Sequence, residues 1–535
     1  IIPDYQLPAK ANEAQTPYQT EVELLQNLQI LPKSFDGDKQ VKRSEFAVMV
    51  AKIMHPVIAF SPSDTLPDAF TDVKSNHKYY GEIRSLKDLG IISGDMFSNF
   101  YPDDIISYQD AVTMLVNALG YGKYAQKKGG YPTGYYNIAQ ETGILRNAPS
   151  GEVTFYKAAK LIYNSLFVDV MSIAGITADS ETMEILEGKN VLSQRLGIEE
   201  YDGVILSDGH ASLNGEEVLN SDEILFRDIK TENTLSMLTG NSQAYSYLGY
   251  RVRLFAKEDK TTGKSTVIYC VPHRSVKVTT IAADSIISAQ TDYIEYEEEK
   301  NSDKYRKLSF GKKAMYVTVN GMKKASYTTE DFKPKEGYIT LIDNGDSKIA
   351  NHLAITSFDY NLVVDQVNST AQVIQCLQSP RNNIDYSDKD AVSFRIYKNG
   401  SLIEPEALNR LDILSVAKSA GKVNGKTLYT AYVGDQSGQG KVEGLIPEEN
   451  IVIVNGQQLG ISKLYLDLKP NLMGQLRSGS EISYSLDVTG KIAYIGKMSS
   501  DGRGFAYLID MQQESGLEED VLLRFYSAQG EICTQ

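Results

Sequence analysis

The sequence predicts an α+β protein of several domains, in which an α-helical N-terminal part precedes several small antiparallel β-sandwich or β-barrel modules. The chain has 535 residues, enough for about three to five domains of ordinary size. Apolar residues recur at helical spacing up to about residue 168. Asn-Gly pairs, the strongest short-range hairpin signal, occur six times after residue 196 and nowhere before it.

Composition and charge exclude several classes of protein. Lys and Arg number 54 and Asp and Glu number 69, which gives a net charge of −15. Because the sequence has no concentrated basic run to neutralise phosphates, we expect no nucleic-acid partner. No apolar run reaches the roughly 18 residues of a membrane span, so we expect none. The 42 % hydrophobic content supports ordinary globular cores.

Six helices are predicted in the N-terminal part, at about 22–31, 44–54, 77–89, 107–119, 135–142 and 154–166. Ser44, Ser107 and Thr154 stand where N-caps belong. The preceding residues, 1–20, are largely polar and lack periodicity, which predicts an extended arm; a disordered terminus is the alternative.

The helices fall into pairs that share a sequence pattern. The first helix of each pair closes on Leu28-Gln29-Ile30, Leu89-Gly90-Ile91 or Thr142-Gly143-Ile144. After a loop, the second helix opens with Val41-Lys42-Arg43-Ser44-Glu45, Ile106-Ser107-Tyr108-Gln109-Asp110 or Val153-Thr154-Phe155-Tyr156-Lys157. Three units in register indicate an internal repeat.

This pattern resembles the S-layer homology repeats, in which a Gly-Ile, a loop and an I/V-T-R-x-E helix start recur. Phe70-Thr71-Asp72-Val73 also matches the F-x-D opening of that family. The resemblance covers about 20–168 and implies three repeats, near 21–60, 70–121 and 130–168, folded as one pseudo-threefold helical unit. In the family this unit holds anionic, often pyruvylated, secondary polymers of bacterial cell walls.

The resemblance also implies a binding site. Family grooves use the Asp of F-x-D, the Arg of T-R-x-E and a nearby aromatic, and a tyrosine stands in here because the chain has no Trp. The implied wall-polymer-binding residues are Arg43, Glu45, Asp72, Tyr79 and Tyr80. Tyr108 and Phe155 occupy the positions aligned with Arg43, so at most one family-like groove is expected.

These residues also have ordinary structural explanations. A glutamate in a first helical turn, such as Glu45, is favoured by the helix dipole alone. Asp72 before a helix fits a turn or cap. Arg43 fits a surface ion pair with Glu45 or Asp36.

The remainder of the chain is predicted to be β. We expect a connector at 169–198 and β modules at 199–280, 281–366, 367–460 and 461–535. Strands are predicted at 250–256, 265–271, 315–319, 363–377, 393–398, 427–433, 451–454, 482–486 and 492–495.

The search for catalytic chemistry finds no motif. None of the five histidines has the spacing of a zinc hydrolase, and G-x-S-x-G is absent. The three cysteines, Cys270, Cys376 and Cys533, are too far apart to indicate a disulfide framework or metal site. Asp343-Asn344-Gly345-Asp346 hints at a calcium loop, but Gly345 breaks the ligand alternation and a tight turn is favoured. We expect no catalytic residue, metal or cofactor; structural calcium has no motif here.

Three functions follow from this sequence. The favoured one is a non-catalytic, secreted structural protein that self-assembles at the bacterial cell surface as a layer, sheath or filament, with homo-oligomeric contacts as its main partners. The alternative is an anchor that binds secondary cell-wall polysaccharide and displays the β modules as a stalk or adhesin. The third is a surface enzyme acting on glycans or peptides.

Overall fold

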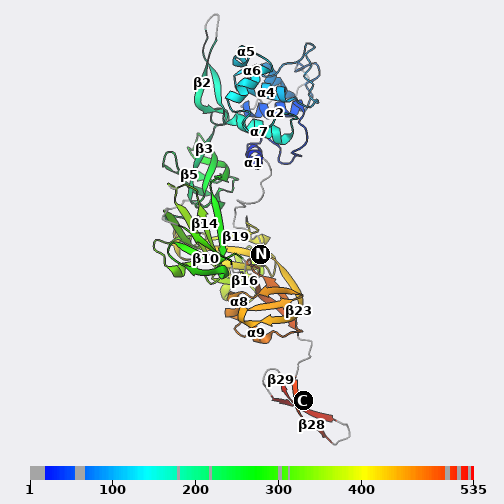
Figure 1. Ribbon diagram of the computed structural model, residues 1–535, viewed down its shortest axis with the longest axis vertical. Helices are drawn as coiled ribbons and strands as arrows, with labels where there is room; N and C mark the ends of the chain where they lie inside the picture. The colour runs from blue at the N-terminus through cyan, green and yellow to red at the C-terminus, as the bar shows by residue number, and fades with distance from the viewer. Residues whose placement is uncertain are drawn as a thin grey trace. The chain divides into compact units, whose positions relative to one another are not determined.

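The computed structural model describes residues 18–54, 67–176, 181–215, 220–298, 304–310, 314–346, 348–499, 506–514, 520–527 and 532–534 (Figure 1). Most of the expected N-terminal arm, 1–17, lies outside the described residues. The chain divides into two compact units. Among the described residues, the first comprises 18–278 together with 342–352, and the second comprises 279–341 and 353–534.

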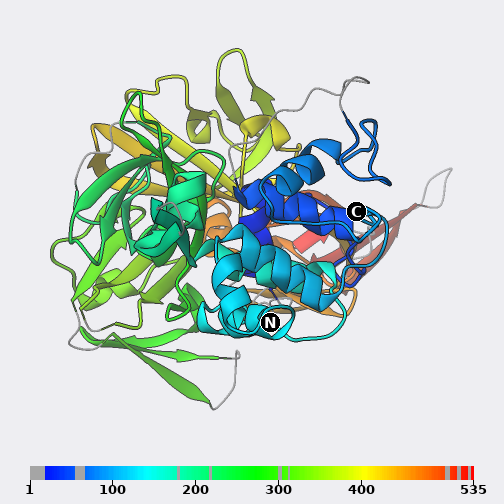
Figure 2. The same cartoon turned by 90° about the horizontal axis from the view of Figure 1, so that it is seen from above.

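The first unit begins with the predicted helical part (Figure 2). Its helices are α1 (Gln19–Asn27), α2 (Arg43–Met54), α3 (Tyr80–Asp88), α4 (Tyr108–Ala118), α5 (Gly122–Lys127), α6 (Thr133–Glu141) and α7 (Phe155–Leu166). All six predicted helices are present, and α5 is an additional helix. Its six residues are too few for a periodic apolar pattern to be recognised.

Two of the three predicted N-caps are confirmed. The side chains of Ser107 and Thr154 accept hydrogen bonds from the backbone N–H groups of Asp110 and Lys157. The expected cap at Ser44 is wrong, because α2 already begins at Arg43 and Ser44 is buried inside it. Glu45 reaches back instead and accepts a hydrogen bond from the backbone N–H of Lys42, at 2.9 Å.

The segments that precede the second helices are joined by backbone hydrogen bonds. Val41 N–H donates to the Val153 carbonyl, and Ile106 N–H donates to the Val41 carbonyl, at 2.9 and 3.0 Å. Arg43 N–H donates to the Asp104 carbonyl at 2.8 Å. The starts of α2, α4 and α7 are therefore held together around the segment before α2.

A closed barrel follows the helices in the first unit. A two-stranded sheet of β1 (Asp169–Ile176) and β2 (Glu181–Asn190) and a short π-helix (Leu192–Leu196) precede it. The barrel strands are β3 (Ile198–Ser207), β4 (Glu223–Asp228), β5 (Thr234–Leu238), β6 (Arg251–Glu258) and β7 (Ser265–Pro272), in the order β3-β4-β5-β7-β6. One apolar core includes helical residues together with Phe255 and Tyr269 of the barrel.

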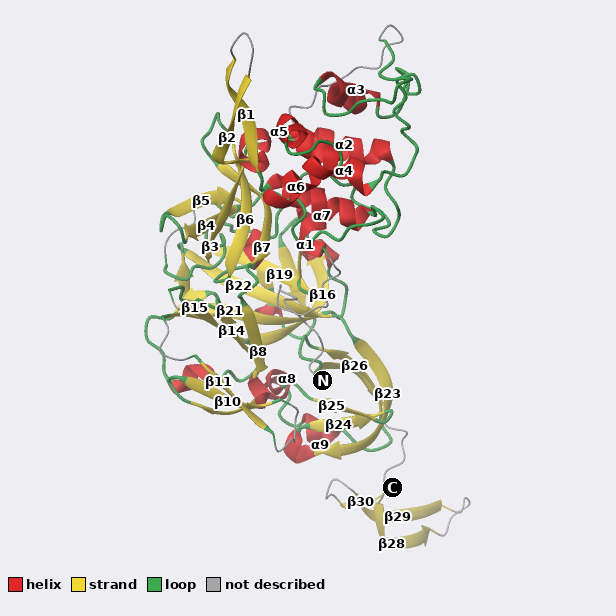
Figure 3. Ribbon diagram, turned by 45° about the horizontal axis from the view of Figure 1, so that its top comes forward, coloured by secondary structure: helices red, strands yellow, loops and turns green. Residues whose placement is uncertain are grey.

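Among the residues that the structure describes, the second unit is built mainly of strands and includes two short α-helices, α8 (Lys463–Leu468) and α9 (Leu472–Gln475) (Figure 3). A three-stranded sheet, β11-β10-β9, is formed by β9 (Ile286–Ala289), β10 (Tyr293–Glu297) and β11 (Tyr305–Ser309). A five-stranded sheet, β13-β12-β15-β14-β8, is formed by β8 (Lys277–Ala282), β12 (Met315–Val319), β13 (Met322–Lys323), β14 (Gly337–Asp343) and β15 (Asn351–Ser357).

Three further sheets follow along the chain. The first, β18-β17-β16-β21-β22-β19-β20, is built from β16 (Tyr360–Asn368), β17 (Val373–Cys376), β18 (Ile384–Asp385), β19 (Val392–Lys398), β20 (Ser401–Ile403), β21 (Ile413–Val423) and β22 (Lys426–Gly434). The next, β25-β24-β23-β26-β27, is built from β23 (Ser437–Ile446), β24 (Ile451–Val454), β25 (Gln457–Gly460), β26 (Glu481–Leu486) and β27 (Ile492–Ser499). The last contains β28 (Ala506–Glu514), β29 (Asp520–Ser527) and β30 (Ile532–Thr534).

The Asn-Gly hairpin predictions hold at four positions. The Asn-Gly turns at Asn320, Asn399, Asn424 and Asn455 each join two antiparallel strands, with positive φ at both residues. Asn344 is different, because it lies in a longer loop between β14 and β15 and its side chain is fully buried. Asn214 is followed by residues outside the described ranges.

The predicted single strand at 363–377 is wrong. The chain forms two strands there, β16 and β17, with a turn at 369–372. The side chain of Asn368 accepts a hydrogen bond from Ala371 N–H, and Gln372 has a φ of 53°. This side-chain-to-backbone bond gives the chain a local turn within an otherwise strand-forming sequence.

A buried polar cluster joins consecutive sheets within the second unit, and we call it the Glu336 network. Its members are Asp284, Glu336, Asn361, Ser415, Ser462, Asp487, Thr489 and Lys491. Glu336 and Asp487 are 1 % and 2 % exposed. Ser462 Oγ donates to Glu336 Oε2 at 2.6 Å, and Ser415 Oγ donates to Asn361 Oδ1 at 2.9 Å. Lys491 Nζ lies 3.1 Å from an Asp284 oxygen and 3.6 Å from Glu336 Oε1.

Candidate functional site

Arg43, the cation expected to bind polymer, is held by neighbours within the helical part. Its Nη1 lies 2.8 Å from Asp110 Oδ2 at the start of α4, and its guanidinium lies over the Phe100 ring, 4.9 Å from the centroid. The side chain is only 19 % exposed. A partly buried ion pair of this kind already satisfies much of the charge that an anionic ligand would need.

Asp72 fixes the loop that carries Phe100. Its two carboxylate oxygens accept the backbone N–H groups of Phe100 and Tyr101, at 2.8 and 2.7 Å. Phe70, two residues earlier, stacks on Phe100 with ring centroids 5.2 Å apart. The F-x-D segment therefore supports the ring on which Arg43 lies, and Arg43 and Asp72 converge on Phe100.

Glu45, Tyr79 and Tyr80 are placed differently. Glu45 holds the backbone at Lys42, whose ammonium pairs with Asp103 at 2.7 Å. Tyr79 is half-buried beneath the Lys78 ammonium, which lies 4.7 Å from the ring centroid. A hydrogen bond with Tyr79 raises the pKa of Lys78. Tyr80 is 4 % exposed and its hydroxyl donates to the Pro67 carbonyl, which makes it a core residue.

The sequence comparison missed the residues that complete this surface. Asp110 occupies the position aligned with Glu45, and the repeat pattern predicts no pairing of Asp110 with Arg43 and no role for Phe100. Tyr131 also lies beside Asp110: burial, followed by the charge and hydrogen bond of that carboxylate, raises the pKa of Tyr131. The pairing of Arg43 with Asp110 spans 67 residues, and no local signal would have indicated it.

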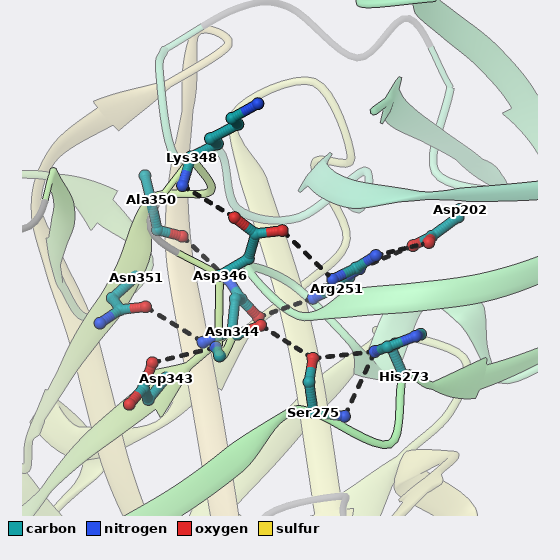
Figure 4. A network of polar contacts seen from close by, with 11 residues as sticks. Asp202, Arg251, His273, Ser275, Asp343, Asn344, Asp346, Lys348, Ala350 and Asn351 are labelled. Carbon is teal, nitrogen blue, oxygen red and sulfur yellow. Dashed lines mark hydrogen bonds and ion pairs between the residues drawn. The ribbon is translucent and has the colours of Figure 1, made fainter. Parts of the chain in front are cut away.

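A second polar constellation lies around the β14–β15 loop in the first unit, and we call it the Asn344 network (Figure 4). Its members are Asp202, Arg251, His273, Ser275, Asp343, Asn344, Asp346, Lys348, Ala350 and Asn351. Asn344 Nδ2 donates to the carbonyls of Gly249 and Ala350, at 3.0 and 2.8 Å. Its Oδ1 accepts Arg251 N–H at 2.8 Å.

Charged groups lie around this amide. The Arg251 guanidinium donates to both oxygens of Asp202, at 2.8 and 2.6 Å, and lies 3.7 Å from Asp346. Gly345 N–H donates to Asp343 at 3.0 Å, which is a local side-chain-to-backbone bond within the loop between β14 and β15.

His273 and Ser275 resemble a nucleophilic pair in distance, with Nδ1 and Oγ 2.8 Å apart. However, the Ser275 hydroxyl donates a hydrogen bond to the Asn344 carbonyl, at 3.0 Å. The backbone N–H of Ser275 donates to His273 Nδ1, at 3.2 Å. Burial, together with the Arg251 charge, lowers the pKa of His273. This pair therefore holds the β14–β15 loop on the barrel.

The residues that the structure describes include neither a cluster suited to a metal ion nor a helix suited to a membrane. Within those ranges, no group of three or more His, Cys, Asp or Glu side chains is placed to hold a metal ion. No helix among them has both the length and the apolar character required to cross a membrane.

Comparison with known proteins places this geometry in context. Residues 69–112, which include Asp72, Phe100 and Asp110, match the S-layer homology domain. The chain is 22 % identical over 451 residues to the Middle cell wall protein of Brevibacillus brevis, covering 77 % of this chain and 42 % of that protein. It is 27 % identical over 141 residues to a Surface layer protein of Brevibacillus choshinensis, covering 26 % and 12 %.

A third relative is the Cell surface protein of Thermoanaerobacter kivui, with 26 % identity over 187 residues, or 34 % of this chain and 22 % of that protein. The chain thus spans less than half the length of the curated relatives it matches. Together the matches define a bacterial cell-surface protein. Within that class, this chain carries an S-layer homology domain at residues 69–112, as its repeat pattern indicated.

Proposed function

We propose that this chain is a non-catalytic structural protein that self-assembles at the bacterial cell surface. The observation that carries the proposal is the extent of the similarity to the Middle cell wall protein. It covers 451 residues, whereas the described helical part ends at residue 166. The sequence similarity therefore extends beyond the helices into the part of the chain that forms the β sheets, and the relative is named for the cell wall.

Exposed apolar side chains supply surfaces suited to lateral packing. Met96 and Phe97, between α3 and α4, are 89 % and 71 % exposed. Asp95 accepts the backbone N–H groups of Phe97 and Asn99, at 2.9 and 2.8 Å, so the loop is held in this conformation. Tyr507 and Met511 on β28 are 77 % and 63 % exposed. Such groups gain free energy when a neighbouring molecule covers them.

Negative-stain electron microscopy of the purified chain, with and without calcium, tests self-assembly. We expect ordered sheets, tubes or filaments. The double substitution Met96→Ser and Phe97→Ser should reduce assembly, whereas Tyr305→Ser, at a 63 % exposed ring on β11, serves as a control at another exposed site. A monodisperse monomer at high protein concentration, in both buffers, would contradict the proposal.

We further propose that the three helix pairs form one repeat unit, with the module boundaries given by the sequence. The hydrogen bonds that join the segments before α2, α4 and α7 support this arrangement. An expressed fragment of 18–168 should fold cooperatively as a unit, which circular dichroism and thermal unfolding can measure. Loss of helical signal in that fragment would show that the helices depend on the barrel.

A second candidate function is anchoring to secondary cell-wall polysaccharide. The convergence of Arg43 and Asp72 on Phe100 favours it, because Asp72 and Phe100 are two residues of the matched S-layer homology domain. If the groove binds polymer, Arg43→Ala should abolish sedimentation with purified cell walls, and Arg43→Lys should weaken it. Lys157→Ala removes a cation of the same helical part and is the control. Unchanged sedimentation of folded Arg43→Ala would exclude this groove.

A further inference from the structure

A pocket of about 360 Å³ lies in the first unit, between the end of α7, the chain that follows α6, and strand β6. Its lining includes Arg146, Lys160, Tyr163, Phe167 and Arg253. The volume is within the range of small-molecule sites. None of these residues belongs to the surface around Arg43 and Phe100, so the pocket is distinct from the groove considered above.

The charges of the pocket do not balance. Lys160 pairs with Glu21 at 2.7 Å, and Arg253 pairs with Glu200 at 2.6 Å. Arg146 is exposed and has no carboxylate within ion-pair distance among the residues that the structure describes. Three cations therefore face two carboxylates, and one positive charge is left for a ligand.

Two aromatic rings form an apolar wall beside these cations. Tyr163 and Phe167 are both partly exposed, with centroids 5.0 Å apart and planes inclined at 57°. Arg253 Nη1 donates to the Tyr163 hydroxyl at 3.1 Å, and its guanidinium lies 5.7 Å from the Phe167 centroid. The cations and rings hold one another in place, and ring surface remains accessible from the pocket.

The backbone that carries Arg146 is also fixed before any ligand arrives. Asn164 Nδ2 donates to the carbonyls of Ile144 and Arg146, both at 2.8 Å. Arg146 N–H donates to the Gly143 carbonyl at 3.0 Å, and Gly143 has a φ of +87°. Only the side chain of Arg146 must be ordered on binding, which limits the entropic cost.

We propose that this pocket binds a small compound with one carboxylate attached to a six-membered ring. The single uncompensated cation favours a monoanion, and a planar guanidinium matches a carboxylate with two parallel hydrogen bonds. The Tyr163 and Phe167 rings would pack against the ring of the ligand. This site goes beyond the structural function proposed above and does not depend on it.

Ligand-observed NMR and calorimetric titration of the full chain test the site. Two probes carry the proposed chemistry from different sources, glucuronate from sugars and benzoate from aromatic acids, while glucose and inorganic phosphate are the controls. We expect one ring carboxylate to bind and glucose to show no binding. If phosphate binds as well as the better carboxylate, or if neither carboxylate binds at millimolar concentration, the proposal is wrong.

Three variants locate the binding. Arg146→Ala should weaken binding about tenfold, as expected for loss of one charge-assisted contact. Phe167→Leu should weaken binding severalfold, because it keeps apolar bulk but removes the ring. Lys157→Ala, on α7, changes the net charge equally without removing a residue that lines the pocket, and it should bind normally. Equal affinity of folded Arg146→Ala and Lys157→Ala would overturn the assignment.

Discussion

The Asn344 network and the Glu336 network both hold loops and sheets together, but the first has a neutral group at its centre and the second has ionisable groups. At the centre of the first, a neutral amide with 0 % exposure makes three side-chain hydrogen bonds, and the charges of Asp202, Arg251 and Asp346 lie at the edge. At the centre of the second, two carboxylates, Glu336 and Asp487, are almost fully buried.

This difference decides how each network responds to pH. An amide has no proton to gain or lose, whereas a buried carboxylate must be paired, hydrogen-bonded or protonated. Burial, followed by the charge of Glu336, raises the pKa of Asp487 to about 6. Near the Asn344 network the titrating groups are instead bases. Burial lowers the pKa of His352 to about 4, and burial together with the Arg251 charge lowers the pKa of His273. The two regions should therefore respond to acid in opposite directions.

The largest expected effect is that of removing the central amide. Asn344→Ala leaves Arg251 N–H and the carbonyls of Gly249 and Ala350 without their partner inside a closed site. We expect a loss of about 3–5 kcal/mol in the free energy of unfolding, measured by denaturant titration.

Asn455→Ala, at the exposed turn between β24 and β25, is the matched control. Its cost should be near 1 kcal/mol, roughly the loss of the hydrogen bond that its amide donates to the Gln439 carbonyl of β23. Equal losses of unfolding free energy in Asn344→Ala and Asn455→Ala would show that burial of the Asn344 amide adds no stability. The neutral amide would then not be what holds the Asn344 network together.

The acid response of the first unit is the next largest. Unfolded histidine takes up a proton near pH 6.5, whereas His352 in the folded chain remains neutral down to about pH 4. The unfolding free energy should therefore fall as the pH drops from 6.5 towards 4, by at most about 3 kcal/mol.

Hydrogen exchange of peptides covering 342–352, between pH 7 and 4.5, would measure this loss after correction for intrinsic rates. His352→Gln has no proton to gain and should give a flatter pH profile. A wild-type profile as flat as that of the variant would show that His352 does not control the acid response.

Much of the local structure was predictable from the sequence, because the signals that specify it are local. The caps at Ser107 and Thr154 act three residues away along the helix, and the turn at Asn399 needs only the glycine beside it. Such signals also identified the repeat pattern, and with it the S-layer homology domain.

The site geometry was not predictable in the same way. Asn344 has the same Asn-Gly signal as the hairpin turns, yet its amide contacts backbone groups 93 and 95 residues away. Arg43 was expected to bind polymer, but its partner Asp110 comes from another helix pair. A pattern along the chain gives no distance between such residues. Whether an Asn-Gly pair forms a hairpin turn or a buried amide that bonds distant backbone groups therefore depends on the tertiary fold.

The Glu336 network should respond to acid with the opposite sign. Asp487 in the folded chain titrates near pH 6, above the ordinary value of 3.8, so the native state binds a proton that the unfolded state still lacks. Stability in this region should rise as the pH falls from 7 to 4, by roughly 2–3 kcal/mol at most.

Hydrogen exchange of peptides covering 481–492 would measure the rise. Asp487→Asn keeps one acceptor for Thr489 and Lys491 and should remove most of the pH dependence. If wild type and variant both lose protection on acidification, Asp487 does not govern the network, and the predicted opposite response of the two regions is wrong.

The smallest effect should come from the charged edge of the Asn344 network. Arg251 contacts Asp202 and Asp346, and these carboxylates are 40 % and 36 % exposed, so water compensates them when the guanidinium is lost. We expect Arg251→Ala to cost about 1 kcal/mol, less at high salt, because the backbone N–H that bonds Asn344 remains. Denaturant titration at low and high ionic strength would measure both quantities. A cost equal to that of Asn344→Ala would mean that the ion pairs, and not the buried amide, hold the β14–β15 loop.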